Sequence, residues 1–304
     1  MAKNQRGDMV NYLPTTKFKL KVNKADAIKY CGLSDSLNNR IVDEIVWDLG
    51  KTSIIKFDLA VLALVAGNDW SRPICFANTV EPGYYNGLDK FLIQKGMCSQ
   101  FVPVAFPQNQ PGYTVMDLDS CYNNIMNKFE YGGLDKGKMF VDENSNRLLV
   151  NVKSVHLRLA DELSRNGQKE KSVKVLERMR EKFTNENVPY YGISPVYYNY
   201  YSVSWIDLYF RNGKSDLAAK IYNPYIDDLS DAMRFFSLNN SFSREYGEEM
   251  KSGQEDVQRL TQMAVQYKDQ KLLDLLKKKF QGMIPVEANI NGQTPTGLEG
   301  QGLQ

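Results

Sequence analysis

An unbroken apolar run, Leu59–Ala66, restricts the possible folds of this chain more than any other feature. Asp58 comes directly before the run and is a residue type that caps helix N-termini, and Gly67 suits the position that ends a helix. A helix that is apolar on nearly every face is expected to be buried from several sides. We therefore predict a helix over 59–66 at the centre of a folded layer.

The segment before this run predicts short strands and short helices. Alternating apolar and basic residues over 18–22 predict a half-exposed strand. A short helix is expected over 25–33, ending near Gly32, and a further helix over 34–45 leads into a strand over 46–49.

The segment after this run predicts a strand, a helix and a second strand. Residues 73–77 follow a proline and are rich in strand formers, residues 86–96 end in Gly96 as a helix does, and residues 98–104 are again typical of a strand. Such a βαβ unit pairs its two strands in parallel through a right-handed crossover. The first part of the chain is therefore predicted to be a small α/β layer.

The chain is expected to divide into three parts. Residues 1–120 form the small α/β domain, and residues 121–283 are almost wholly helical in pattern. The tail over 284–304 is rich in Gly, Gln, Pro and Thr and is predicted to be disordered. Hydrophobic residues make up 42% of the 304-residue chain, which is enough for a buried core.

The helical part contains an internal similarity. "LADELSRNGQKEKSVKVL" (159–176) aligns with "WIDLYFRNGKSDLAAKIY" (205–222), and their two "RNG" tripeptides are 46 residues apart. Tetratricopeptide units repeat every ~34 residues and HEAT units every ~40–47. We predict an α+β fold whose α/β layer is followed by a tetratricopeptide-like α-solenoid. Two unrelated helical hairpins are the alternative.

Composition excludes several classes of function. With 38 basic and 36 acidic residues the net charge is +2, which gives no strong field for nucleic acid. A single histidine, His156, excludes a multi-histidine metal site and is expected at a helix surface or edge. We expect no metal, no cofactor and no nucleic-acid partner. No phosphate-binding or hydrolase motif is present, and the acidic pairs have the flanking residues of solvated helix faces.

Two segments supply candidate binding residues. The loop "EPGYYNGLDK" contains Tyr84, Tyr85, Asn86 and Asp89, and its backbone amides can hold an anion where a helix begins; turn chemistry explains the same residues without a ligand. Arg72 lies nearby, before Pro73, where it can pair with Asp69 or Glu81.

The second candidate segment is the helix after Ser194. Its aromatic residues suit a row of stacking platforms for a sugar or a peptide, or a packed interface between helices. The candidates are Tyr197, Tyr198, Tyr201 and Trp205.

The four cysteines contain no CxxC pair. Cys75 and Cys98 fall on the two predicted parallel strands, so a disulfide between them and two free thiols both remain open. The longest apolar run is far short of the roughly 20 residues that span a bilayer, and the N-terminus has no apolar signal core. As given, the chain is expected to be soluble.

Three segments resemble, as a set, the C-terminal soluble region of a domain-of-unknown-function family of large multi-pass bacterial membrane proteins. The membrane half of that family resembles protein O-mannosyltransferases and other lipid-sugar-dependent glycosyltransferases. The resemblance covers Lys17 to Tyr225 and is carried by "KFDLAVLALVAGNDWSRPICFANTV", "YYNGLDKFLIQKGMCSQFVPV" and "VDENSNRLLVNVKSVHLRLADELSRNGQKEKSVKVLERMREKF". The family usually has an aromatic residue in place of Cys75 and an arginine in place of Lys153.

The resemblance implies a periplasmic region, attached to the inner membrane when it is part of a longer chain, that ends in a tetratricopeptide-like array. The family's catalytic acid lies in the membrane half, so no catalytic residue is carried over. The first hypothesis is a non-catalytic binding or scaffold region that contacts protein or glycan partners beside a membrane-embedded glycosyltransferase-like protein. A free-standing helical-repeat scaffold and a soluble carbohydrate-active enzyme using the Tyr84–Asp89 loop are the alternatives.

Overall fold

The computed structural model describes residues 2–3, 7, 9–10, 15–51, 53–107, 114–193, 197–238 and 245–286. The chain divides into two compact units, Met1–Asn124 and Ile125–Gln304, and each is described by itself. The predicted disordered tail over 284–304 lies outside the described residues from 287 onward.

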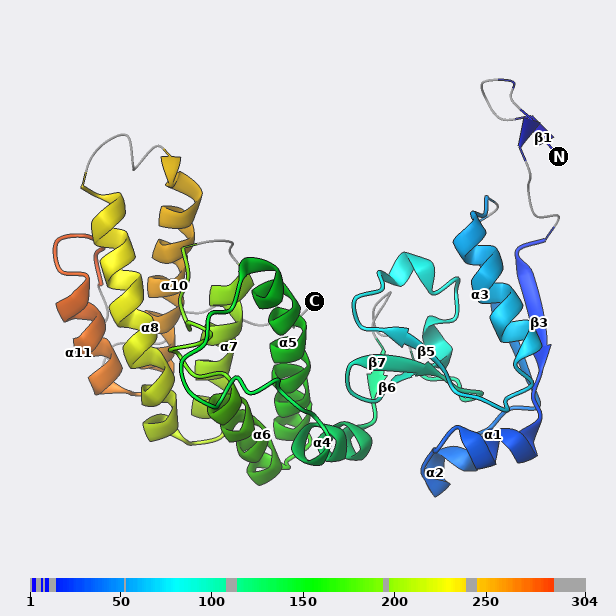
Figure 1. Ribbon diagram of the computed structural model, residues 1–304. Coiled ribbons are helices and arrows are strands. Elements are labelled where there is room, and N and C mark those ends of the chain that lie inside the picture. Colours follow the sequence, from blue (N-terminus) through cyan, green and yellow to red (C-terminus); the bar gives the residue numbers. More distant parts are fainter. Residues whose placement is uncertain are drawn as a thin grey trace. The chain divides into compact units, whose positions relative to one another are not determined.

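The first unit mixes short strands and helices, in agreement with the predicted mixed class (Figure 1). Strands β1 (Ala2–Lys3) and β2 (Met9–Val10) form one antiparallel pair, and β3 (Lys17–Lys21) and β4 (Glu44–Asp48) form another. The strand predicted over 18–22 is confirmed as β3, and the first predicted helix as α1 (Lys24–Tyr30). The helix predicted over 34–45 is wrong beyond its start, because only α2 (Asp35–Asn38) is helical.

A four-stranded sheet has the order β5-β7-β6-β8. Its strands are β5 (Ile74–Ala77), β6 (Leu92–Gln94), β7 (Cys98–Phe101) and β8 (Val115–Met116). β7 pairs antiparallel with both β5 and β6, and β6 pairs in parallel with β8.

The predicted βαβ unit is therefore wrong. The expected crossover helix over 86–96 is a single 3₁₀ turn, Asp89–Phe91, followed directly by β6. The apolar residues Leu88, Phe91 and Leu92 suggested one helix face, but all three are buried because β6 lies in the middle of the sheet. In so short a segment, hydrophobic spacing does not separate a buried strand from a helix.

Helix α3 (Lys56–Gly67) contains the apolar run and packs on the core of the first unit through one face only. Asp58, Val61 and Val65 are buried, in positions three and four residues apart that share one face. Val61 and Val65 belong to the same hydrophobic core as Ile45 and Trp47 of β4. The prediction that this helix is buried from several sides is wrong, since Leu59 is 53% exposed and Leu64 is 63% exposed.

Helices are the only regular secondary structure among the described residues of the second unit. Its helices are α5 (Glu143–Arg165), α6 (Lys169–Lys182), α7 (Tyr197–Arg211), α8 (Ser215–Phe236), α10 (Gly247–Gln266) and α11 (Gln270–Lys279); α4 (Leu118–Asn127) joins the two units. Pairs α5–α6, α7–α8 and α10–α11 are hairpins, and each hairpin contacts the next (Figure 1).

The three hairpins share one turn geometry. Gly167 (φ 75°), Gly213 (φ 71°) and Lys268 (φ 54°) all have left-handed backbones between the paired helices. The next amide in each case reaches back five residues, from Gln168 to Leu163, from Lys214 to Tyr209 and from Asp269 to Ala264. This is the hydrogen-bond pattern of a glycine-type helix C-terminus. The "RNG" similarity thus marks equivalent turns, and the tetratricopeptide-like arrangement remains a prediction.

His156 is fully buried in α5, which contradicts the expected surface position. Its Nδ1 lies 2.7 Å from the Val152 carbonyl oxygen and its Nε2 lies 2.8 Å from the Tyr131 hydroxyl. Burial lowers the pKa of His156 to about 4, and the nearby Arg178 adds to that effect. The ring packs edge-on against Phe183, so His156 is a neutral core residue.

Candidate functional site

The loop that holds four of the predicted binding residues packs against the end of β4. Tyr84 ends the 3₁₀ turn Pro82–Tyr84 and is 39% exposed, whereas Tyr85 and Asn86 are buried. Asp89 is half-buried and begins the next 3₁₀ turn, which is too short to offer a helix N-terminus to an anion. The predicted loop is thus mostly an internal support, with Tyr84 at its surface.

Gly87 fixes the distance between this loop and β4. Its backbone has a φ of 75°, and a Cβ atom at this position would lie 2.0 Å from the Asp48 carbonyl oxygen. Only glycine permits that approach, because any side chain would collide with the backbone of Asp48. The neighbouring Asn86 also has a left-handed backbone, with a φ of 56°.

A buried ion pair lies beside the loop. Asp58 is 1% exposed, accepts a hydrogen bond from the Ile55 amide at 2.9 Å and pairs with the Lys51 ammonium at 2.7 Å. Burial acts to raise the pKa of Asp58, but the Ile55 amide and Lys51 outweigh it and hold the pKa below its usual value. Asp58 therefore carries a negative charge that Lys51 neutralises.

Asn86 completes this buried group. Its side chain helps to lower the pKa of Asp58, so the two groups are close. Among the described residues, however, neither its amide nitrogen nor its amide oxygen has a hydrogen-bond partner of ordinary length. Burying an amide without such a partner costs folding free energy, so we infer that the surrounding residues hold Asn86 in this position.

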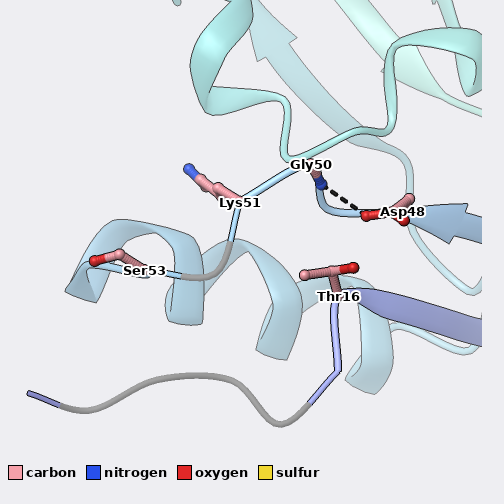
Figure 2. Close-up of a pocket in the computed structure, with 5 residues that line it drawn as sticks. All are labelled: Thr16, Asp48, Gly50, Lys51 and Ser53. Atoms are coloured by element: carbon pink, nitrogen blue, oxygen red, sulfur yellow. Dashed lines mark hydrogen bonds between the residues drawn. The ribbon is translucent and has the colours of Figure 1, made fainter. Parts of the chain in front are cut away.

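An open pocket of about 550 Å³ lies where β3, β4 and the start of α3 meet, and Thr16, Asp48, Gly50, Lys51 and Ser53 line it (Figure 2). The Gly50 amide donates to Asp48 Oδ1 at 2.9 Å. That bond, the Thr16 hydroxyl and Lys17 lower the pKa of Asp48. The pocket thus presents an ionised carboxylate and two hydroxyl groups, which suit a small polar ligand, while the Lys51 ammonium pairs with Asp58. Among the described residues, no three acidic, histidine or cysteine side chains are grouped to hold a metal ion.

The outer face of α3 is almost wholly apolar. Its exposed residues include Phe57, Leu59 and Leu64, with Ile55 at the N-cap and small alanines between them. Phe57 also contacts Tyr84 edge-on, with ring centroids 5.1 Å apart, which connects the helix to the loop. We call Ile55, Phe57, Leu59, Leu64 and Tyr84 the α3 surface. Several exposed large apolar side chains gathered on one element commonly mark a site of protein or membrane contact.

The remaining predicted residues do not join this surface. Arg72 is exposed, and among the described residues it forms no ion pair with Asp69 or Glu81. Trp205 is 1% exposed and Tyr201 is half-buried, and the backbones of Tyr197 and Tyr198 lie in α7 while their side chains lie outside the described residues. Trp205 packs edge-on against Tyr190, so it stabilises the helical core.

Sequence reasoning missed the pocket residues. Thr16, Asp48, Lys51 and Ser53 form no recognisable motif, because the pocket depends on the antiparallel pairing that places Lys17 opposite Asp48. One usable signal was a charged residue and a glycine two positions apart, Asp48 and Gly50, at the end of a predicted strand.

A protein-family model, TMEM260-associated domain 2, matches residues 1–120. That stretch contains the pocket, the α3 surface and all strands of the first unit. The match identifies a domain of unknown function, and it supports neither the glycosyltransferase resemblance nor a bacterial origin. No curated protein and no solved structure matches the chain.

None of the helices in the described part of the chain has the length and apolar character that a membrane-spanning segment needs.

Proposed function

We propose that this chain is a non-catalytic binding region that docks, through the α3 surface, on a membrane-embedded glycosyltransferase-like protein. The observation that carries the proposal is the exposed apolar side of α3 in the region that matches TMEM260-associated domain 2. The name of that family describes a domain associated with TMEM260, which favours a partner over independent action. The periplasmic location and the tetratricopeptide-like array for protein acceptors belong to the same proposal.

The physical argument rests on the cost of exposed apolar area. Four large apolar side chains at the start of α3 and along it are between 41% and 63% exposed, and they are Ile55, Phe57, Leu59 and Leu64. Covering a large apolar side chain contributes roughly 1.5–3 kcal/mol when the burial is complete. A partner that covers these four residues therefore gains several kcal/mol before the cost of association. Alanines between the leucines allow the backbone of a partner helix to approach closely.

The pocket gives the docking surface a polar end. Asp48 and Lys51 line it, and Lys51 comes shortly before α3 in the sequence. Charges at the rim of an apolar contact set orientation and specificity more than affinity. The occupant we infer is thus a protein surface with an apolar centre and a polar edge.

The test is binding of the purified chain to the TMEM260-like membrane protein of the same organism, held in detergent. The Leu59→Glu, Leu64→Glu double variant is expected to lose binding by about tenfold or more, because it places two charges in the apolar contact. Val46→Glu is the matched control. Val46 is 54% exposed and lies on β4 between the buried Ile45 and Trp47, so it points away from the core that α3 covers.

Equal binding of the wild type and the double variant contradicts the proposal, as does an equal loss with Val46→Glu. Circular dichroism of each variant checks that the fold is intact; all three substitutions fall on exposed positions, where changes in stability are usually within about 0.5 kcal/mol. Turnover of a glycoside by the purified chain, abolished by Asp48→Asn, would instead establish the carbohydrate-active alternative at the pocket.

A further inference from the structure

Two of the four cysteines face the same side of the four-stranded sheet. Cys75 lies on β5 opposite Gln100, and Cys98 lies on β7 opposite Ala77. Residues two apart on a strand share a face, so Cys75 and Cys98 are diagonal neighbours on adjacent antiparallel strands. They are 23 positions apart in the sequence, and the strand register alone brings them together.

The two thiols differ from the other cysteines in accessibility. Cys75 is exposed and Cys98 is half-buried, whereas Cys31 and Cys121 are buried, and all four are free thiols. The exposed pair lies at the edge of the sheet, because β5 is an edge strand. A reagent in solution therefore reaches this pair and not the other two.

The surroundings favour a thiolate at Cys98. A hydrogen bond from the Cys75 thiol lowers the pKa of Cys98 to about 6, against the effect of burial, and Lys95 lowers it further. The same interaction raises the pKa of Cys75, which keeps Cys75 a thiol. Lys95 is fixed in place, since its ammonium donates to the carbonyl oxygens of Cys31 and Gly32 at 2.8 Å each.

We propose that Cys75 and Cys98 form a redox-active dithiol, in which Cys98 is the attacking sulfur and Cys75 is the resolving sulfur. The oxidant is a disulfide, either of a small molecule or of a protein. The Cys98 thiolate attacks one sulfur of that disulfide, forms a mixed disulfide and releases the first thiolate. Cys75 then loses its proton and attacks the Cys98 sulfur, and the second thiolate of the oxidant leaves. The oxidant gains two electrons and leaves as two thiolates, the proton lost by Cys75 goes to one of these thiolates or to solvent, and the chain gains one disulfide.

The arrangement makes this bond reversible. Diagonal neighbours are further apart than residues directly opposite each other, so closing the bond requires the four-residue edge strand β5 to shift toward β7. A disulfide that strains its surroundings and stays exposed is more easily reduced than a buried structural one. This site therefore responds to the redox state of its compartment, and it does so independently of the proposed docking function.

The test is exposure of the full chain to glutathione disulfide, followed by an acid quench and peptide mass spectrometry. In the wild type we expect one intramolecular Cys75–Cys98 bond, seen as the loss of two hydrogens. In Cys75→Ser we expect glutathione to accumulate on Cys98, because no resolving thiol is present. In Cys98→Ser we expect glutathione to add to Cys75 at least about tenfold more slowly than it adds to Cys98 in Cys75→Ser, because burial still raises the pKa of the Cys75 thiol.

Cys31→Ser and Cys121→Ser serve as controls and are expected to form the bond at the wild-type rate. Alkylation of Cys98 measured against pH adds a second readout: an apparent pKa near 6 in the wild type that rises in Cys75→Ala, which removes the hydrogen-bond donor. Glutathione on both cysteines without an intramolecular bond would overturn the proposal. Faster reaction of Cys75 than of Cys98 would overturn the assignment of attacking and resolving sulfurs.

Discussion

Replacing Lys153 by methionine is expected to make the helical unit more stable at pH 7. Lys153 lies in α5, is 4% exposed and forms no ion pair with any described residue. Its ammonium lies 5.8 Å from the centre of the Phe183 ring, which is a weak compensating contact. Burial lowers the pKa of Lys153 from 10.5 to about 8. The charge is therefore held in the core at a cost.

The size and sign of this cost follow from the shift in pKa. A change from 10.5 to about 8 corresponds to about 3 kcal/mol of unfolding free energy. The unfolded chain binds the proton more tightly than the folded chain, so it holds more protons between pH 8 and pH 10.5. Stability of the wild type consequently rises with pH over this window, and the whole penalty is present below pH 8. By pH 9.5 about 2 kcal/mol of it is removed.

The assay is urea denaturation of wild type and Lys153→Met at pH 7 and pH 9.5. The variant is expected to exceed the wild type by up to about 3 kcal/mol at pH 7, and by about 1 kcal/mol at pH 9.5. Lys174→Met is the control, because Lys174 is exposed on α6, and it is expected to change stability by less than about 0.5 kcal/mol at either pH. A loss of stability at pH 7, or a difference that does not change with pH, would refute the reasoning.

Two further predictions concern His156 and Gly87. The pKa of His156 is lowered to about 4 in the folded chain, so as the pH falls below about 6.5 the unfolded chain takes up the His156 proton before the folded chain does. The free energy of unfolding, measured by urea denaturation, should therefore drop by about 2 kcal/mol between pH 7 and pH 5. His156→Gln should lack this part of the decline, and an unchanged decline contradicts the assignment. Gly87→Ala should destabilise the first unit by about 2 kcal/mol or more, since its Cβ would meet Asp48. Gly50 has a similar φ of 74°, but a Cβ added there would have no atom within 4 Å, so Gly50→Ala should lower the free energy of unfolding by only about 1 kcal/mol. If Gly50→Ala and Gly87→Ala shifted the thermal-melting temperature equally, the contact with Asp48 would be unimportant.

Elements with a clear period were predictable from the sequence, and elements whose form depends on distant pairing were not. Strand β3 has strict alternation, and α5 is preceded by the N-cap Asp142, whose side chain accepts from the Asn144 and Ser145 amides. The segment 86–96 has neither signal. Its apolar residues are buried because β6 lies between β7 and β8, and the pairing with β8 (Val115–Met116) leaves no signal within the segment itself.

The candidate site shows the same division. Tyr84 was accessible to prediction because a glycine- and tyrosine-rich loop is conspicuous, whereas the pairing of Lys51 with Asp58 was hidden. Asp58 was expected to precede the helix as its cap, but α3 begins at Lys56, so Asp58 is its third residue and its carboxylate accepts a hydrogen bond from the Ile55 amide at the N-cap. The sequence contained no indication that the same carboxylate would be buried beside Asn86, since that contact depends on the left-handed backbone at Asn86 and Gly87.

The error about α3 carries the most information about function. An all-apolar helix permits two explanations: the fold covers it completely, or the fold covers one face and a partner covers the rest. The burial of Asp58, Val61 and Val65 accounts for one face, and it leaves Leu59 and Leu64 without a structural reason to be leucine. Exposed leucines on a helix that is otherwise polar are common and need no explanation. On α3, however, Lys56 is the only charged residue among the exposed positions, so the second explanation accounts for the sequence of the outer face and the first does not.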